Sequence, residues 1–416
     1  MTKKSSTPAI RFKGFTDTWE QRKLGDMMNV TSVKRIHQSD WTDSGVRFLR
    51  ARDIVAAAKN EEPDDYLYIS KEKYEEYSAL SGKVGVSDLL VTGVGTIGVP
   101  YLVRNLEPLY FKDGNIIWFQ NSDKIDGKFL FYSFSAEQIQ GFINESAGIG
   151  TVGTYTIESG KKTPISLPNQ IEQAKVGEFF QQLDNLITLH QRKFEKLTNV
   201  KKSMLEKMFP QNGSSYPKIR FKGFTDPWEQ RKVSDVAEIC TGGTPSTGIE
   251  KYWYPKEIPW LSSGEVHKKY ITYTDNKISV EGMNNSSARM IPENSVLIAL
   301  AGQGKTRGTV AINRIPLTTN QSIAAMAFSN EVVPEFVFCN LESRYEEIRR
   351  MSSGDGSRGG LNKQIIGETE IPYTSKEEQT IIGAYFFNLD NLITLHQREL
   401  EKLQNIKKSM LEKMFV

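Results

Sequence analysis

The sequence has little cysteine, no long apolar run and little net charge. Cys240 and Cys339 are its only cysteines, which excludes a disulfide framework or a cysteine-rich metal cluster and suits a reducing cytoplasm. No apolar run reaches the roughly 18 residues that would predict a helix across a bilayer. The first residues, MTKKSSTPAIRFKG, lack the apolar core of a signal peptide. The formal net charge of +3 is too small to identify a nucleic-acid partner by itself.

Two segments of the first half return almost unchanged in the second half. LDNLITLHQRKFEKLTNVKKSMLEKMF at Leu183–Phe209 becomes LDNLITLHQRELEKLQNIKKSMLEKMF at Leu389–Phe415. IRFKGFTDTWEQRKLGD at Ile10–Asp26 becomes IRFKGFTDPWEQRKVSD at Ile219–Asp235. The repeat spacing is half the chain, which indicates a duplication rather than a series of small repeats. What lies between the repeated segments barely matches, so two similar frames hold different inserts.

The longer repeated segment predicts a long helix in each half. Its apolar residues recur at intervals of three and four, and the pattern extends back to about Ile171 in the first copy and about Lys376 in the second. About 40 residues give a helix of about 60 Å, whose apolar stripe needs a partner along most of its length. The nearest candidate is the other copy. The alternative is that each helix packs on its own domain.

Packing or partner contacts are expected from helix residues at matching positions in the two copies. His190 and His396 lie amid the apolar stripe without a cysteine or second histidine nearby, so we interpret them as packed or interfacial and not as metal ligands. The candidates are Leu183, Leu186, His190, Leu197, Leu389, Leu392, His396 and Leu403.

The inserts predict two mixed α/β domains of roughly 150 residues each. Short β-type runs lie at 46–54, 88–95, 115–120, 295–300, 308–313 and 322–328. Helices are expected at Lys71–Leu80 and Pro334–Arg350, and PQNGSSYP predicts a linker. The predicted segments are an arm with the start of the repeat (1–18), a first insert domain (19–168), a central helix (169–209), the linker (210–218), a second insert domain (219–372) and a C-terminal helix (373–416).

Two glycine-rich motifs invite an enzyme interpretation. Gly93, Gly95 and Gly98 form a GxGxxG, but VPYLV follows where a dinucleotide fold needs a helix. ALAGQGKT at Ala299–Thr306 resembles a phosphate-binding loop, yet extended residues again follow it. We therefore favour a strand, turn and strand at both places, and keep an ATP-using enzyme as an alternative. No catalytic set and no metal site is predicted.

Loops at corresponding places in both halves combine small residues with cations. Besides the two glycine turns, 146–162 and 352–364 precede the long helices and are rich in Gly, Ser and Thr. Small residues let a backbone approach phosphates, cations neutralise them, and Gln and Arg can read base edges. Ordinary surface loops are the alternative. The DNA-binding candidates are Thr96, Lys161, Lys162, Gln303, Lys305, Arg307, Arg358 and Lys363.

Taken together, these features resemble the specificity subunit of type I restriction–modification enzymes. The resemblance rests on TGGTPSTGIEKYWYPKEIPWLSSGEV (241–266), ALAGQGKTRGTVAI with TTNQSIAAMAF (299–328) and SSGDGSRGGLNKQIIGETEIPYTSKEEQTIIGAYFFNLDNLI (352–393). The first half follows the scheme more loosely and has no GGTP element after Asp26.

The resemblance implies an α+β fold with a pseudo-two-fold internal repeat. Two target recognition domains are separated by two long antiparallel helices, and each domain reads one half of a bipartite, asymmetric double-stranded DNA target. Partners would be two methyltransferase subunits and restriction or translocase subunits, in the cytoplasm and without a membrane. This chain would bind no cofactor, whereas its partners would use S-adenosylmethionine, ATP and Mg. The chain has no Asn-Pro-Pro-Tyr motif, which agrees with a non-catalytic subunit. A coiled-coil adaptor that does not bind DNA is a further alternative.

Overall fold

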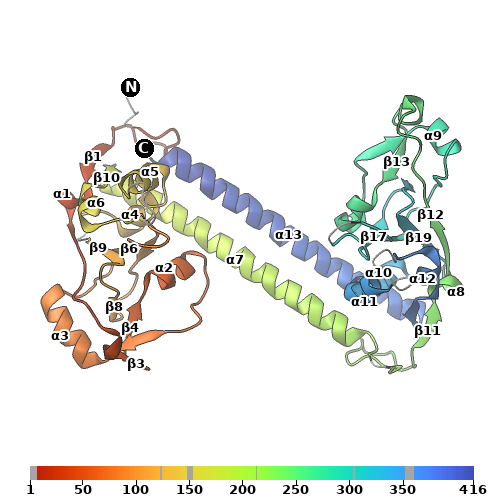
Figure 1. The fold of residues 1–416 in the computed structure, drawn as a ribbon, viewed down its shortest axis with the longest axis horizontal. Coiled ribbons are helices and arrows are strands. Elements are labelled where there is room, and N and C mark those ends of the chain that lie inside the picture. The colour runs from red at the N-terminus through yellow and green to blue at the C-terminus, as the bar shows by residue number, and fades with distance from the viewer. Residues whose placement is uncertain (1–6, 122–123, 148–152, 212, 303–304, 352–359) are drawn as a thin grey trace. The chain divides into compact units, whose positions relative to one another are not determined.

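The repeated sequence forms two helices of equal length. The structure is a computed structural model in which α7 spans Gln170–Met208 and α13 spans Lys376–Met414, each with 39 residues (Figure 1). Both bounds agree with those predicted from the apolar periodicity. The structure describes residues 7–121, 124–147, 153–211, 213–302, 305–351 and 360–416.

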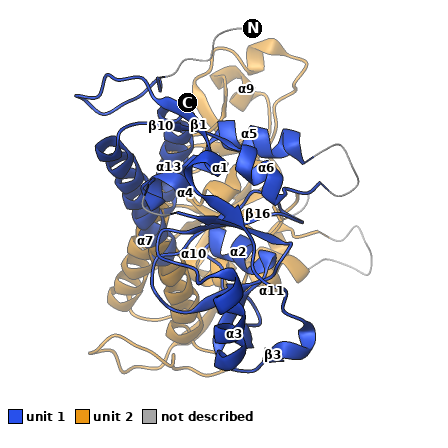
Figure 2. Cartoon of the chain, turned by 90° about the vertical axis from the view of Figure 1, so that its left-hand side faces the viewer, with its two compact units in different colours: residues 1–192, 397–416 blue, residues 193–396 orange. Residues whose placement is uncertain are grey.

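The chain folds into two compact units, each with one insert and one end of each long helix. Unit 1 comprises residues 1–192 and 397–416, and unit 2 comprises residues 193–396 (Figure 2). Each unit is mixed α and β, as the sequence predicted.

Unit 1 opens with short elements and reaches α7 through a strand that pairs back to its beginning. Its elements are β1 (Glu20–Lys23), α1 (Leu24–Met27), β2 (Asn29–Thr31), η1 (Gln38–Asp40), β3 (Trp41–Thr42), β4 (Val46–Leu49), α2 (Ala51–Ala58), β5 (Leu67–Ile69), α3 (Lys71–Ser81), β6 (Leu89–Thr92), β7 (Pro100–Leu102), β8 (Leu109–Phe111), β9 (Ile116–Gln120), α4 (Gly127–Ser133), α5 (Glu137–Ser146), α6 (Ile157–Lys162) and β10 (Pro164–Leu167). The strands form three sheets, in the orders β2-β9-β6-β7, β3-β5-β4-β8 and β1-β10.

Unit 2 repeats this plan with a different set of insertions. Its elements are β11 (Glu229–Lys232), α8 (Val233–Val236), β12 (Ala237–Thr241), η2 (Glu250–Tyr252), β13 (Ile258–Leu261), η3 (Ser263–Lys268), β14 (Tyr270–Ile271), β15 (Asn276–Ile278), α9 (Val280–Asn284), β16 (Val296–Ala299), β17 (Val310–Asn313), β18 (Thr318–Thr319), β19 (Ile323–Phe328), α10 (Pro334–Ser343), α11 (Tyr345–Arg350), α12 (Lys363–Glu368) and β20 (Glu370–Tyr373). Its sheets are β12-β19-β16-β17-β14, β15-β13-β18 and β11-β20. The order β12-β19-β16-β17 matches β2-β9-β6-β7 of unit 1, which makes these the equivalent central sheets.

Two sequence-based expectations need correction. The run at 46–54 was expected to be extended, but α2 begins at Ala51 because Asp53 caps it: the Arg50 amide donates to Asp53 Oδ2 at 2.8 Å, and the Arg50 guanidinium pairs with the same carboxylate. The helix expected over Pro334–Arg350 is divided at Arg344 into α10 and α11. Local capping by Asp53 therefore decided the start of α2.

Equivalent aromatic residues join the long helices to each insert. In unit 1 the ring of Phe415 lies 5.5 Å from Phe129 and 5.7 Å from Phe180. In unit 2 Phe209 lies 5.3 Å from Phe336. Trp19 and Trp228, at matching places in the shorter repeat, contact the same two clusters. The repeated residues thus build the part of each core that the two units share.

Within each unit the two helices run antiparallel and form an ion pair. In unit 1 Asp184 of α7 pairs with Lys407 of α13 at 2.6 Å, and Phe180 reaches Phe415 further along. In unit 2 Lys201 of α7 pairs with Asp390 of α13 at 2.6 Å. Asp184 and Asp390 occupy the same repeat position, as do the two lysines. The two ion pairs are therefore reciprocal copies of one contact.

The two copies differ in burial. Lys201 is 9% exposed and contacts Glu342 at 2.5 Å as well as Asp390, whereas Lys407 is 26% exposed. Burial alone would lower the pKa of Lys201, but the charges of Glu342 and Asp390 outweigh burial and raise the pKa. Removal of Lys201 leaves Glu342 and Asp390 buried with the more exposed Lys269 as their remaining cation, whereas water can replace the half-exposed Lys407.

We predict that Lys201→Met destabilises unit 2 by about 3 kcal/mol, at the lower end for a broken buried pair because Lys269 remains, whereas Lys407→Met costs about 1 kcal/mol or less. Denaturant titration of the two variants measures the difference. Lys202→Met and Lys408→Met are matched controls, because both side chains are exposed one residue further along the helices. Equal losses at Lys201 and Lys407 would contradict the assigned difference in burial.

Candidate nucleic-acid interface

The first glycine motif is a tight turn between β6 and β7 at one end of the central sheet. Gly95 and Gly98 have φ values of 70° and 77°, which favour glycine. The Gly93 amide donates to the Asn115 carbonyl at 2.8 Å, and a Cβ on Gly93 would lie 2.6 Å from the Tyr155 carbonyl oxygen. The structure confirms a turn followed by a strand, so this GxGxxG lacks the helix of a dinucleotide site. Thr96 lies exposed in the turn.

The second motif occupies the equivalent turn between β16 and β17. A strand follows it too, so the phosphate-binding-loop interpretation and the ATP-using alternative are not supported. The side chain of Lys305 is exposed, while its carbonyl accepts a hydrogen bond from the Tyr345 hydroxyl at 2.8 Å. Arg307 is half-buried and donates to the Arg349 carbonyl at 2.9 Å, so it also fastens the turn to the end of α11. Gln303 lies outside the described residues.

The segments before the long helices correspond in fold but not in their cations. The region expected to be a loop ends in α6 in unit 1 and leads into α12 in unit 2, and Thr156 and Asn362 cap these short helices at equivalent positions. Lys161 lies near the end of α6, whereas Lys363 is the first residue of α12. The two segments therefore lie at matching places, but their lysines do not. Arg358 lies outside the described residues.

The structure separates two predicted lysines from the glycine turn. The side chain of Lys161 pairs with Glu158 at 2.8 Å and lies against Gly25, where an added Cβ would be 2.9 Å from the lysine Cβ. Gly25 precedes β2, whereas the glycine turn meets the other end of the sheet. Lys162 is the next residue and is exposed. Lys363, in contrast, is exposed at the start of α12, which packs against β12 of the central sheet.

Sequence reasoning missed two pairs of side chains at the same end of the central sheets. Arg35 contacts Asp113 in unit 1, and Thr244 contacts Gln321 in unit 2. Each pair joins a residue in the loop after β2 or β12 to a residue just before β9 or β19. The two residues of a pair are about 80 positions apart in the sequence. Only the pairing of β2 with β9, and of β12 with β19, brings them together. No local sequence signal could have found them.

The eight predicted helix residues fall into three groups. Leu183 and Leu389 are buried in the cores of their units, and Leu197 and Leu403 pack against those cores. Leu186 and Leu392 are 43% and 44% exposed. His190 and His396 are half-buried, and both take part in interactions within the structure. The exposed leucines have equally exposed neighbours one turn on, which are Leu189 and Leu395.

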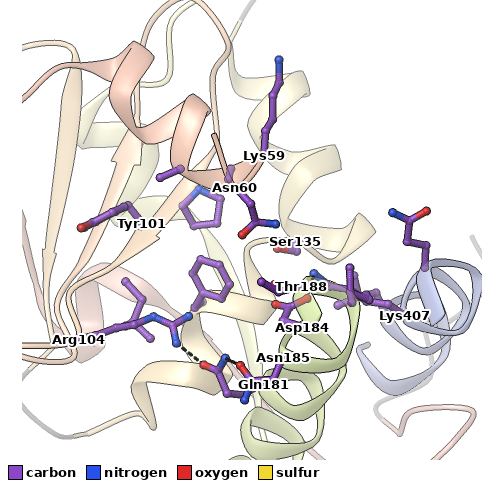
Figure 3. A pocket seen from close by; sticks show the side chains of 18 of the residues that line it. Lys59, Asn60, Tyr101, Arg104, Ser135, Gln181, Asp184, Asn185, Thr188 and Lys407 are labelled. Atoms are coloured by element: carbon purple, nitrogen blue, oxygen red, sulfur yellow. Dashed lines mark hydrogen bonds and ion pairs between the residues drawn. The ribbon is translucent and has the colours of Figure 1, made fainter. Parts of the chain in front are cut away.

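A cavity of about 1230 Å³ in unit 1 separates the end of α2 and β7 from the long helices (Figure 3). Arg104 donates to Gln181 across one wall, and the Tyr132 hydroxyl donates to Asp184 at 2.7 Å. Burial raises the pKa of Tyr132, and the hydrogen bond to Asp184 raises it further, so the hydroxyl stays protonated at neutral pH. Cations and carboxylates both line the cavity, so the lining does not select for an anion.

The described residues offer neither a metal centre nor a membrane span. No group of three or more His, Cys, Asp or Glu side chains among them could hold a metal ion. None of the described helices combines the length and the apolar character needed to cross a bilayer.

Comparison with known proteins identifies the duplicated unit. A family model described as the type I restriction modification DNA specificity domain matches residues 16–199 and again residues 225–405. The chain is 22% identical to the putative type I restriction enzyme MjaX specificity subunit of Methanocaldococcus jannaschii, over 95% of this chain and 92% of that protein. It is 29% identical to the MjaIX specificity subunit of the same organism, over 45% of this chain.

Several matches are partial. The chain spans 44% of the length of the MjaIX subunit and 37% of the HindI specificity subunit of Haemophilus influenzae. Among solved structures, a type I restriction–modification system S subunit from M. genitalium shares the fold, with a TM-score of 0.64 over 99% of both chains at 16% identity. Because the family model covers most of both halves, this chain belongs to the type I restriction–modification DNA specificity family.

Proposed function

We propose that this chain is the DNA-recognition subunit of a type I restriction–modification complex and reads a bipartite, asymmetric target. The observation that carries the proposal is the double match to a DNA specificity domain, in which nearly identical frames hold different inserts. Each insert would read one half of the target, and the unread spacer would lie between the halves. Phosphate contacts would supply most of the affinity, and base contacts would discriminate.

In this proposal the chemistry belongs to partner subunits in the cytoplasm. Two methyltransferase subunits would methylate adenine with S-adenosylmethionine, and restriction subunits would use ATP and Mg to translocate and cleave DNA. This chain would direct them and bind none of these cofactors itself. The alternative of a coiled-coil adaptor, which would leave the complex without sequence-specific DNA binding, is not supported by the match to a DNA specificity domain.

The exposed leucines of the long helices are the proposed contacts for the methyltransferase subunits. Leu186 and Leu189 in unit 1 repeat as Leu392 and Leu395 in unit 2, and each of the four is more than 40% exposed. Four leucines exposed on helices at repeated positions indicate a contact surface better than scattered apolar residues do. Two equivalent copies suit two copies of one partner.

Duplicating one insert tests the reading of half-sites. The β11–β20 sheet has the same EQRK strand as the β1–β10 sheet, so residues 233–369 can be replaced by residues 24–163 without altering either frame. We predict that cells carrying this chain and its methyltransferase then methylate a symmetric target, with the first half-site on both sides. Mapping methylated adenines by single-molecule sequencing measures this. An unchanged target, or a change in both halves, would contradict the modular assignment.

Replacement of Lys305 tests the phosphate contact. Because its side chain is exposed on the glycine turn, we predict that Lys305→Ala weakens DNA binding of the assembled complex for all sequences. The slope of log affinity against log salt should fall by about one unit, as one released counterion requires. Lys222→Ala is the control, since Lys222 is exposed in the shorter repeated segment, which both halves share. An unchanged slope would remove Lys305 from the interface.

Replacement of the exposed leucines tests the partner surface. We predict that Leu186→Ser with Leu189→Ser weakens binding of a methyltransferase subunit at least about tenfold, because two apolar contacts are lost. Sedimentation or calorimetry with the purified partner measures this. Leu80→Ser is the control, because Leu80 is 67% exposed on α3, away from the long helices. Equal affinity of the double variant and the control would exclude this surface.

A further inference from the structure

In unit 1 two loops that are far apart in the sequence meet at one end of the central sheet. The loop that follows β2 passes beside the residues that precede β9, and there Arg35 Nε donates to Asp113 Oδ2 at 2.9 Å. The Arg35 side chain is 67% exposed, while Asp113 is 13% exposed. Asp113 Oδ1 is buried and has no hydrogen-bond partner among the described residues. The largely buried carboxylate of Asp113 therefore fixes Nε of Arg35, while the rest of the guanidinium is exposed.

Unit 2 has another pair at the equivalent crossing. The loop after β12 passes beside the residues before β19, and there the Thr244 hydroxyl donates to Gln321 Oε1 at 2.7 Å. Both side chains are exposed. Because β12 and β19 correspond to β2 and β9 in sheet order, the two crossings are the same place in the fold. We call each of them the strand-end crossing of its unit.

Both strand-end crossings are fixed by their neighbours. Val33 and Ile36 flank Arg35 and are 8% and 1% exposed, so the loop is anchored on both sides. In unit 2 a Cβ on Gly242 would lie 1.9 Å from the Thr319 carbonyl oxygen, and one on Gly243 would lie 2.5 Å from Ser287 Oγ. The GGTP segment therefore passes through a gap that admits only glycine, and Thr244 emerges at a defined position.

The free atoms of each pair match the edge of a base. With Nε engaged by Asp113, the two terminal nitrogens of Arg35 form a fork that suits O6 and N7 of guanine. Gln321 keeps its amide donors and a second oxygen lone pair, which suit N7 and the N6 amine of adenine. Arg35 and Gln321 thus offer the two side-chain types that read purines in the major groove.

The neighbouring charges favour a nucleic acid over a protein at these crossings. Lys34 is exposed beside Arg35, and Lys305 is exposed on the turn at the same end of the unit 2 sheet. The frame repeats while the paired side chains differ, as reading of two unlike half-sites requires. Resting on the function proposed above, we propose that the strand-end crossings are base-reading sites, at which Arg35 reads a guanine in one half-site and Gln321 an adenine in the other. Asp113 and Thr244 position these two side chains.

The unit 1 site is tested with Arg35→Lys in the complete complex with its methyltransferase. Lysine keeps the charge but loses the fork, so discrimination at one base pair of one half-site should fall by about tenfold to hundredfold. Methylation of a target library with every base substituted at each position measures it. Asp113→Asn should loosen the same base pair to a smaller extent, as expected for a positioning residue. Arg22→Lys is the control, because Arg22 also pairs with a carboxylate, Glu20, but lies on the β1–β10 sheet.

The unit 2 site is tested with Gln321→Ala in the same assay. Discrimination at one base pair of the other half-site should fall, and Thr244→Val should weaken it at that base pair. Gln230→Ala is the control, because Gln230 is exposed on the β11–β20 sheet. Thermal unfolding midpoints identify any variant that is misfolded, and both targets are exposed enough for these substitutions to be tolerated.

The outcomes separate this inference from the proposed function. Suppose that the unmodified complex methylates a split target, but that Arg35→Lys and Gln321→Ala change specificity no more than the control variants do. The strand-end crossings then do not read bases, and only this inference fails. Loss of specificity in both half-sites from either single variant would also overturn it. If the unmodified complex shows no sequence-specific target, the proposed function fails first.

Discussion

The antiparallel pairing of the two long helices, marked by a reciprocal ion pair, is the contact on which each unit depends. Asp184 with Lys407 and Asp390 with Lys201 are one contact made twice, because the antiparallel helices carry the same sequence. Each unit needs one end of both helices, so neither unit is complete from one half of the chain. The duplicated sequence must therefore pair with its own copy, and this constraint explains why the helices stay nearly identical while the inserts differ.

Different inserts attach to this shared contact in different ways. In unit 1 the Tyr132 hydroxyl of α4 donates to Asp184 at 2.7 Å, and in unit 2 the Tyr270 hydroxyl of β14 donates to Asp390 at 3.2 Å. Burial raises the pKa of both tyrosines, which keeps both hydroxyls protonated as donors. A tyrosine from an unrelated element thus satisfies the same carboxylate, and the frame accepts dissimilar inserts. The strand-end crossings show the same principle with side chains that face outward.

The repeat and its helices could be predicted because their signals are local and periodic. Apolar spacing placed both ends of α7 and α13 within a residue or two, and the residues after each glycine motif predicted strands and not helices. Cation positions could not be predicted in this way. Lys161 and Lys363 look equivalent in composition, but they occupy opposite ends of the short helices α6 and α12. Thr156 and Asn362 start the two helices at equivalent positions, so each lysine's place depends on its distance from the cap, which is five residues for Lys161 and one for Lys363.

The sequence by itself determined that the chain is a duplication with two long helices and two unlike mixed domains. The near-identity of the repeated segments and the constant spacing of their apolar residues can be read from the sequence without any tertiary information. Only the tertiary structure decided which polar residues meet. Arg35 and Asp113 are 78 residues apart, and Thr244 and Gln321 are 77 residues apart, so their contacts exist only because antiparallel strands bring distant loops to one sheet end. Pairing between strands carries no periodic signal in a single sequence, whereas a helix repeats its contacts every three or four residues.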